Sequence, residues 1–181
     1  MSPWRTAKAA LALALCCAAP SALAAATKAH SSANGLYAIR FVQDAPGKCR
    51  VEVQKDQDVV WTMPQCLGTV DDLFFVSNSG ERFWQIRPLP EIPPRVKGDK
   101  KSPLMRAVVA VLYEKDGRVL RSLRLEDFIV GYRLGLVRQL GHHFKWLEGT
   151  FDVPGKGPRV TDKDEVELDT VAQKTHTLKF E

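Results

Sequence analysis

The sequence predicts a mainly β protein, either an antiparallel β-sandwich or a propeller-like stack of sheets, with one short helix. Three observations carry this prediction. Apolar residues after position 35 mostly recur with a period of two, which is the spacing of strands with one buried face. Turn-forming residues separate these strands at regular intervals. A single segment follows helical spacing instead.

Three strands are predicted at the start of the domain, and the last two of them form a hairpin. Residues 37–41 and 49–54 alternate between apolar and polar side chains. The polar run 55–58 then predicts a turn into a further strand over 59–63. We therefore expect the second and third of these strands to pair.

Two more hairpins are predicted in the middle of the chain. Residues 73–76 and 82–86 flank Ser77-Asn78-Ser79-Gly80, whose Asn and Gly tolerate the positive φ of tight turns. Residues 106–113 are predicted as a strand that is apolar on both faces after Arg106, which is typical of a central strand, and Asp116-Gly117 predicts the turn into 119–123.

At the end of the chain, residues 165–169 and 175–180 alternate again and predict a last pair of strands. Between the third hairpin and this pair, apolar residues recur at helical spacing. Glu126 and Asp127 suit the start of a helix there, and Gly141 suits its end. The residues that predict this helix are Leu125, Ile129, Tyr132, Leu136 and Leu140.

Residues 1–26 have the pattern of a secretory signal peptide. Arg5 and Lys8 precede the apolar run 9–19, and small residues follow it. The sequence allows cleavage after Ala24, Ala25 or Ala26. We expect a flexible lead-in over 27–35, and one β-rich domain over 36–181.

Two alternatives to a cleaved leader stay open. A retained anchor needs about 20 apolar residues, more than this run provides. A lipoprotein would use Cys16 or Cys17, but neither follows the small residue that lipid attachment normally requires. The prediction is therefore a periplasmic or secreted protein without a transmembrane segment after leader removal.

Charge argues against nucleic acid as a partner. The whole chain carries a formal net charge of +5. Without the leader, 24 basic and 21 acidic residues leave +3, which is a mild bias.

Cys49 and Cys66 are the two cysteines outside the leader. An even pair in an exported chain predicts a disulfide, and the predicted strands place these residues at the ends of one hairpin. Two separate buried thiols are the alternative.

No cofactor, metal site or catalytic motif is predicted. HExxH, GxSxG and GxGxxG are absent from the sequence. Neighbouring His142 and His143 would point to opposite sides of an extended segment, and His176 fits a partly buried structural position. The acidic cluster suits a solvated strand face better than a calcium loop. Its members are Asp162, Asp164, Glu165, Glu167 and Asp169.

A proline-rich segment over 87–95 separates the second and third hairpins and predicts an extended surface loop. The basic residues that follow could contact an anionic surface, such as lipid headgroups or a cell-wall polymer. A solvated loop and a ligand for a proline-binding domain are the alternatives. The candidate binding residues are Arg95, Lys97, Lys100 and Lys101.

Three stretches of the sequence resemble a pattern found in other proteins. Residues 75–84, residues 111–123 and Leu125-Glu126-Asp127 resemble a pattern in uncharacterised exported bacterial proteins, with hairpins like those of propeller blades. The resemblance implies a β-rich fold in the cell envelope and brings no catalytic residues with it.

The sequence thus favours an exported, non-enzymatic β domain that binds or supports an envelope component, either a protein or an anionic surface. The alternative is a small secreted hydrolase whose site is assembled from distant residues. Ser77, Asp127 and His143 are the candidates for such a site.

Overall fold

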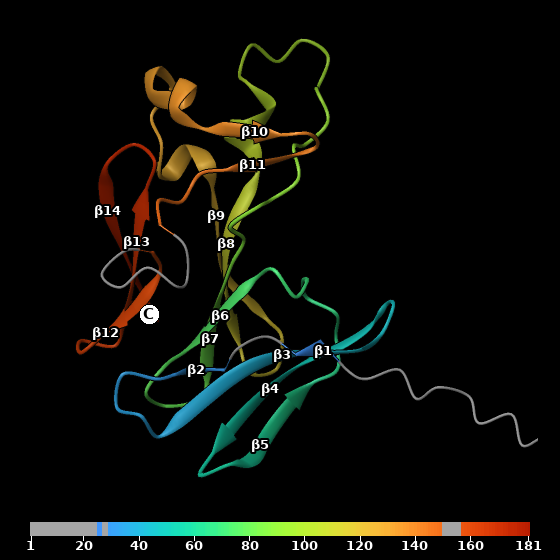
Figure 1. The fold of residues 1–181 in the computed structure, drawn as a ribbon, viewed down its shortest axis with the longest axis vertical. Helices are drawn as coiled ribbons and strands as arrows, with labels where there is room; N and C mark the ends of the chain where they lie inside the picture. The colour runs from blue at the N-terminus through green and yellow to red at the C-terminus, as the bar shows by residue number, and fades with distance from the viewer. Residues whose placement is uncertain (1–24, 27–28, 150–156) are drawn as a thin grey trace, which may run out of the picture.

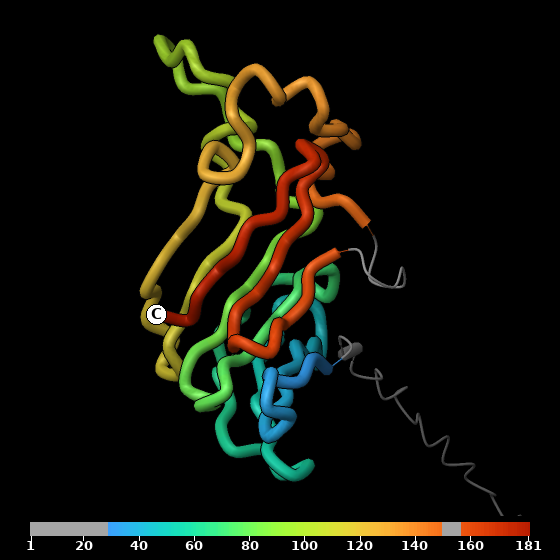
Figure 2. The backbone as a smooth tube through the Cα atoms, turned by 90° about the vertical axis from the view of Figure 1, so that its left-hand side faces the viewer, coloured from blue at the N-terminus to red at the C-terminus, as the bar shows by residue number. Residues whose placement is uncertain are grey.

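The structure is a computed structural model that describes residues 25–26, 29–149 and 157–181. Antiparallel strands dominate these residues and form three larger sheets and one two-stranded sheet. The larger sheets lie against one another in an elongated body, and long connections gather at one end of it (Figures 1 and 2). The mainly β, antiparallel fold predicted from the sequence is confirmed.

The first sheet consists of β3, β4 and β5, with the short β1 and β2 both paired to β3. Its inward positions alternate along the strands, so that Ile39, Val51 and Val53 are fully buried. Asp56 and Gln57 form the β4–β5 turn, with φ of 51° and 75°. The bounds are Ala25–Ala26 (β1), His30–Ser31 (β2), Tyr37–Ala45 (β3), Lys48–Lys55 (β4) and Asp58–Met63 (β5).

The second sheet is the centre of the fold because both of its faces are covered. On β6, Leu73 and Phe75 pack in one core cluster, while Phe74 and Val76 pack in the other. A strand buried on both sides needs apolar residues at consecutive positions. The same holds on β8, as the sequence predicts. The bounds are Leu73–Val76 (β6), Arg82–Ile86 (β7), Val108–Glu114 (β8) and Val119–Arg124 (β9).

The third sheet covers the face of the central sheet that is opposite the first sheet (Figure 2). Val166 and Leu168 are fully buried in this contact. The indole N–H of Trp84 donates to the carbonyl of Lys179 at 3.1 Å, and a guanidinium N–H of Arg82 donates to the carbonyl of Phe180 at 2.7 Å. The bounds are Arg159–Thr161 (β12), Glu165–Thr170 (β13) and Lys174–Lys179 (β14).

The continuous helix predicted from the spacing of Leu125 to Leu140 is wrong. Two short 3₁₀ turns, η2 and η3, and a strand, β10, occupy this segment. Val130 interrupts the helical conformation, because its backbone is extended, with ψ of 147°. Leu125 and Ile129 are buried, as a core stripe requires, but Tyr132 is 84% exposed. The bounds are Pro103–Arg106 (η1), Leu125–Asp127 (η2), Gly131–Leu136 (η3), Arg138–Leu140 (β10) and His143–Lys145 (β11).

The segment 27–35, predicted as a flexible lead-in with nothing to bury, belongs to the first sheet over its described part. β2 pairs with β3, and Ser32 is buried. The backbone N–H of Asn34 donates to the side-chain oxygen of Asn78 at 2.7 Å, which ties the segment to the central sheet. That prediction is therefore corrected from residue 29 onward. Residues 1–24 of the predicted leader, and residues 27–28, lie outside the described residues.

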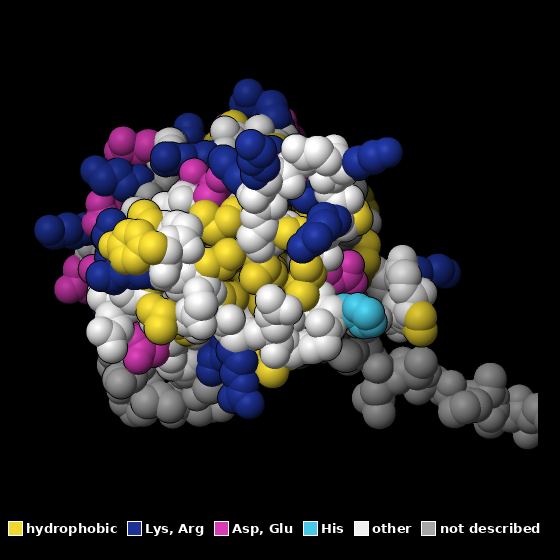
Figure 3. Space-filling model, turned by 90° about the horizontal axis from the view of Figure 1, so that it is seen from above, with side chains coloured by type: hydrophobic (Ala, Val, Ile, Leu, Met, Phe, Trp, Pro, Cys, Tyr) yellow, Lys and Arg dark blue, Asp and Glu magenta, His cyan; other side chains and the backbone are white. Residues whose placement is uncertain are grey.

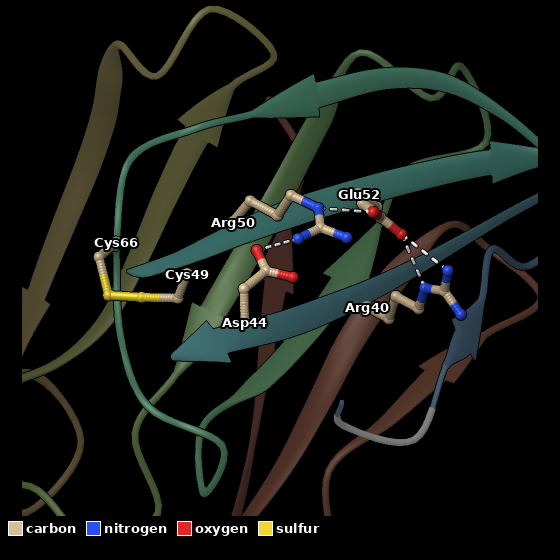
Figure 4. A network of polar contacts seen from close by, with 6 residues as sticks. All are labelled: Arg40, Asp44, Cys49, Arg50, Glu52 and Cys66. Carbon is tan, nitrogen blue, oxygen red and sulfur yellow. Dashed lines mark hydrogen bonds and ion pairs between the residues drawn. A yellow bond between two sulfur atoms is a disulfide. The ribbon is translucent and has the colours of Figure 1, made fainter. Parts of the chain in front are cut away.

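The predicted disulfide joins Cys49 on β4 to Cys66 beyond β5 (Figure 4). The two Cα atoms are 4.8 Å apart, and 17 positions separate the residues in the sequence. The bridge closes the open end of the β4–β5 hairpin. Within the described ranges, every helical segment is too short or too polar to span a bilayer.

Candidate functional site

The long connections of the fold form one end of the molecule, which we call the loop end and define as residues 88–106 and 130–145. It is the upper end of the body in Figure 1. The backbone N–H of Ile92 donates to the carbonyl of His142 at 2.8 Å, and that of Phe144 donates to the carbonyl of Pro90 at 3.2 Å. These bonds join the proline segment to the β10–β11 hairpin, so that two stretches far apart in the sequence form one surface.

All four predicted binding residues lie on the loop end and are exposed. Lys101 is partly neutralised, because its ammonium lies 2.8 Å from the carboxylate of Glu126. Among the described residues, Arg95, Lys97 and Lys100 have no ion-pair partner. Three of the four cations are therefore available to an external anion.

Polar contacts at its base hold the loop that carries the four predicted binding residues, 95–101. A guanidinium N–H of Arg106 donates to the carboxylate of Asp99 at 2.8 Å, and another donates to the carbonyl of Pro94 at 2.9 Å. The backbone N–H of Lys101 donates to Asp99 at 2.8 Å. The loop thus presents its cations from a held position, which lowers the entropic cost of binding.

The second half of the loop end was missed as a binding region because the sequence was interpreted as a core helix there. Residues 130–145 contain three basic and no acidic residues. Together the two stretches hold eight basic and two acidic residues, a net charge of +6, whereas residues 27–181 as a whole carry +3. The remainder of the domain is therefore net negative. A run without acidic residues is the sequence signal that could have revealed this region.

Apolar side chains are exposed in the middle of this basic surface. Seen from above, apolar atoms lie at the centre of this end and also towards its left side, with lysine and arginine mostly around them (Figure 3). Exposed apolar side chains among basic ones are typical of an interaction surface. The exposed apolar residues are Leu89 (42%), Val96 (54%), Val130 (51%), Tyr132 (84%), Leu136 (53%) and Leu140 (42%).

A groove of about 840 Å³ runs along the side of the loop end, between the proline segment and the chain that follows the disulfide. Pro90, Ile92 and Leu140 give it an apolar wall, and Arg87 and Asp72 give it polar groups. Its lining therefore mixes apolar side chains with both acidic and basic groups and has no excess of positive charge.

Asp72 at this groove has a structural role. Its carboxylate accepts hydrogen bonds from the side chain of Gln85 at 2.8 Å and from the backbone of Thr69 at 3.1 Å. Burial raises the pKa of Asp72 above its ordinary value of 3.8. A Cβ at Gly68 would lie 2.2 Å from the carboxylate of Asp72 and 2.4 Å from the amide of Gln85, so a larger residue there would displace this hydrogen-bonded pair. The sequence favours a turn role over a catalytic dyad for Asp71-Asp72, and these contacts agree with that interpretation.

The residues considered for a hydrolase are not brought together. Ser77 lines a separate hollow of about 700 Å³ near the carboxyl terminus, whereas His143 lines the groove at the loop end. Asp127 accepts a hydrogen bond from the backbone of Arg124 at 2.7 Å, within the η2 turn. The three residues therefore do not form a nucleophile–base–acid arrangement of the kind hydrolysis requires.

The predicted acidic cluster is engaged in structural contacts. Arg159 lies 2.6 Å from the carboxylate of Glu167 and 2.7 Å from that of Asp169. Asp164 accepts a hydrogen bond from the backbone of Asn78 at 2.9 Å. In the described parts of the chain, no three His, Cys, Asp or Glu residues are placed to hold a metal ion. His176 packs against Phe128, and burial lowers its pKa below 6.5.

A separate ionic cluster lies on the outer face of β3 and β4 (Figure 4). Glu52 is buried between Arg40, at 2.8 Å, and Arg50, at 2.7 Å, and Arg50 also pairs with Asp44. Burial alone would raise the pKa of Glu52, but hydrogen bonds from the two guanidinium groups hold it below 4.5. Because every member has a partner, this cluster stabilises the first sheet and offers no free charge to a ligand.

We predict that the Glu52 cluster makes stability fall at acid pH. A carboxyl group with a lowered pKa stabilises the fold fully above its ordinary value, here 4.5, and loses that contribution as pH falls through the lower folded-state pKa. The E52Q variant should lose about 1–2 kcal/mol at neutral pH, because both arginines are about one-third exposed.

Urea denaturation at a series of pH values measures this effect. The unfolding free energy of E52Q should depend less on pH below 4.5 than that of the parent. The control is E81Q, since Glu81 forms a half-exposed pair with Lys115 that contributes little. Equal acid sensitivity in the parent and E52Q would contradict the assignment.

Scans and searches against protein-family models, curated proteins and solved structures each found no match to this chain. The resemblance to exported bacterial β-rich proteins therefore stays a prediction.

Proposed function

We propose that this protein is an exported, non-enzymatic β domain that binds an anionic component of the cell envelope through its loop end. One observation carries the proposal. Unpaired cations from two distant stretches of the chain meet around exposed apolar side chains at a single end of the fold. A surface of this composition is complementary to phosphate-rich surfaces that also have an apolar phase or apolar groups.

The charge distribution supports binding in one orientation. The loop end has a net charge of +6, and the rest of residues 27–181 is net negative. An anionic surface would attract the first and repel the second. Such an asymmetry steers association and aligns the molecule before contact.

Export is supported by the leader pattern and by the disulfide. The charged, apolar and small-residue order of 1–26 is that of a secretory signal. The Cys49–Cys66 bridge suits an oxidising compartment. On this basis the proposed location is periplasmic or secreted, where lipid headgroups and wall polymers are the accessible anionic components.

Removing the three unpaired cations should weaken binding strongly. The triple variant R95Q/K97Q/K100Q loses about 1 kcal/mol per cation near an anionic membrane, or more than a hundredfold in partition coefficient. Sedimentation with phosphatidylglycerol-containing vesicles measures this loss, and a soluble polyphosphate tests phosphate without lipid. Raising the salt concentration should weaken binding of the parent protein as well.

The matched control is K48Q/R121Q/K163Q, which removes three exposed cations outside the loop end. It should bind like the parent, because the charge loss is equal but the location differs. If both triple variants lost affinity equally, net charge alone would account for binding. If the parent bound neither vesicles nor polyphosphate, the proposed function would be wrong.

A further inference from the structure

The apolar residues of the loop end project from its outermost parts. The η3 turn and the loop that contains Val96 lie furthest along the long axis of the body (Figure 1). Tyr132 is 84% exposed, Val96 54% and Leu136 53%. Basic side chains surround this patch (Figure 3). A flat surface laid across this end would therefore meet both exposed apolar side chains and cations.

The exposed side chains of η3, Tyr132 and Leu136, stay outside the protein core because contacts of their neighbours hold η3 in place. A guanidinium N–H of Arg133 donates to the carbonyl of Ala172 at 2.6 Å, which ties η3 to the β13–β14 turn. Leu134 packs against the core, and Val137 is buried. Leu134 in η3 and Val137 just after it thus face the core, whereas Tyr132 and Leu136 face outward. Their exposure is a property of the held backbone.

The composition of the patch distinguishes between anionic partners. A wall polymer or free phosphate can neutralise the cations, but it provides no apolar interior for the exposed apolar side chains of this end. A bilayer leaflet provides both, since phosphates lie above the acyl region. Tyrosine is also favoured at the level of lipid headgroups, because its ring is apolar and its hydroxyl is polar. The guanidinium of Arg133 lies 5.7 Å from the centre of the Tyr132 ring, which places a cation directly beside this tip.

We infer that the loop end inserts into the outer part of an anionic lipid leaflet, with Val96, Tyr132 and Leu136 below the phosphates and the cations of 95–101 at the phosphates. The inference rests on the proposed function and adds its partner, a phospholipid bilayer. Binding then has two separable components. Cations provide attraction that depends on salt, and apolar tips provide insertion that salt does not abolish.

Insertion is tested with a Y132W variant in vesicles of phosphatidylglycerol and phosphatidylcholine, with and without brominated acyl chains. The added indole should shift its emission to shorter wavelength and be quenched by the brominated lipid. Trp84 and Trp146 are fully buried, and Trp61 lies on β5 in the first sheet, so the parent protein gives the background. V96S/L136S should lower the vesicle partition coefficient by about tenfold or more, while polyphosphate binding stays unchanged.

The matched control for the apolar pair is V60S/V119S, because these valines are 47% and 53% exposed and lie outside the loop end. It should bind vesicles like the parent. Absence of quenching in Y132W, or no loss in V96S/L136S, with charge-dependent binding retained, would overturn insertion and leave the proposed function standing. Absence of binding to both vesicles and polyphosphate would overturn both proposals.

Discussion

Replacing Trp84 by alanine is expected to destabilise the fold by about 3–5 kcal/mol, because it opens a cavity between the central and third sheets. Trp84 is fully buried, and its indole N–H donates to the carbonyl of Lys179 at 3.1 Å. The W84A variant would lose the packing contacts and leave that carbonyl without its partner. Both losses act at the interface that holds the stack together.

Trp61 provides the control for W84A. It also donates its indole N–H to a backbone carbonyl, that of Gly80 at 2.8 Å, but its side chain is only partly buried. W61A should therefore cost about 1 kcal/mol or somewhat more. Urea denaturation followed by circular dichroism measures both variants. If W84A were no more destabilised than W61A, the stacked arrangement of the sheets would be wrong.

Removal of the Cys49–Cys66 bridge is expected to cost about 3 kcal/mol. The bridge joins residues 17 positions apart, and a loop of this size restricts the unfolded chain by roughly that amount. The C49A/C66A variant should unfold at a lower urea concentration than the oxidised parent. Cys66 is exposed, so a reductant can reach the bond in the folded protein.

The comparison with reductant separates the bridge from the substitutions. Reduction should lower the stability of the parent toward that of C49A/C66A and leave the variant unchanged. A parent whose unfolding free energy was the same with and without reductant would contradict a stabilising bridge.

The order of the strands was readable from the sequence because local chemistry determines it. Two-residue periodicity identified β3, β4, β13 and β14, and Asp116-Gly117 identified the turn between β8 and β9. The consecutive apolar residues of β8 identified a strand covered on both faces. Each of these signals lies within a few neighbouring residues.

The 130–145 segment could not be read in the same way. Tyr132, Leu136 and Leu140 have helical spacing, and in a domain of this size such spacing normally marks a buried face. Here Gly131 and Gly135 weaken the helix, and the extended backbone at Val130 ends the turn that precedes η3. The apolar residues are exposed because the tertiary fold places this segment at the end of the stack.

Only one of the two stretches of the loop end was predicted as a binding region, because sequence patterns are local. Arg95, Lys97, Lys100 and Lys101 stand together in the sequence, so their clustering was visible. Their association with Tyr132 and Leu136 depends on backbone bonds between the proline segment and the β10–β11 hairpin. About forty residues separate the two stretches, and no local pattern predicts that contact.

The loop end as the binding surface is tested most directly by amide hydrogen exchange in the presence of phosphatidylglycerol-containing vesicles. The account predicts slower exchange in residues 88–106 and 130–145, with unchanged exchange in the β4–β5 hairpin at the other end of the molecule. Slower exchange in that hairpin, with no change at the loop end, would contradict the account.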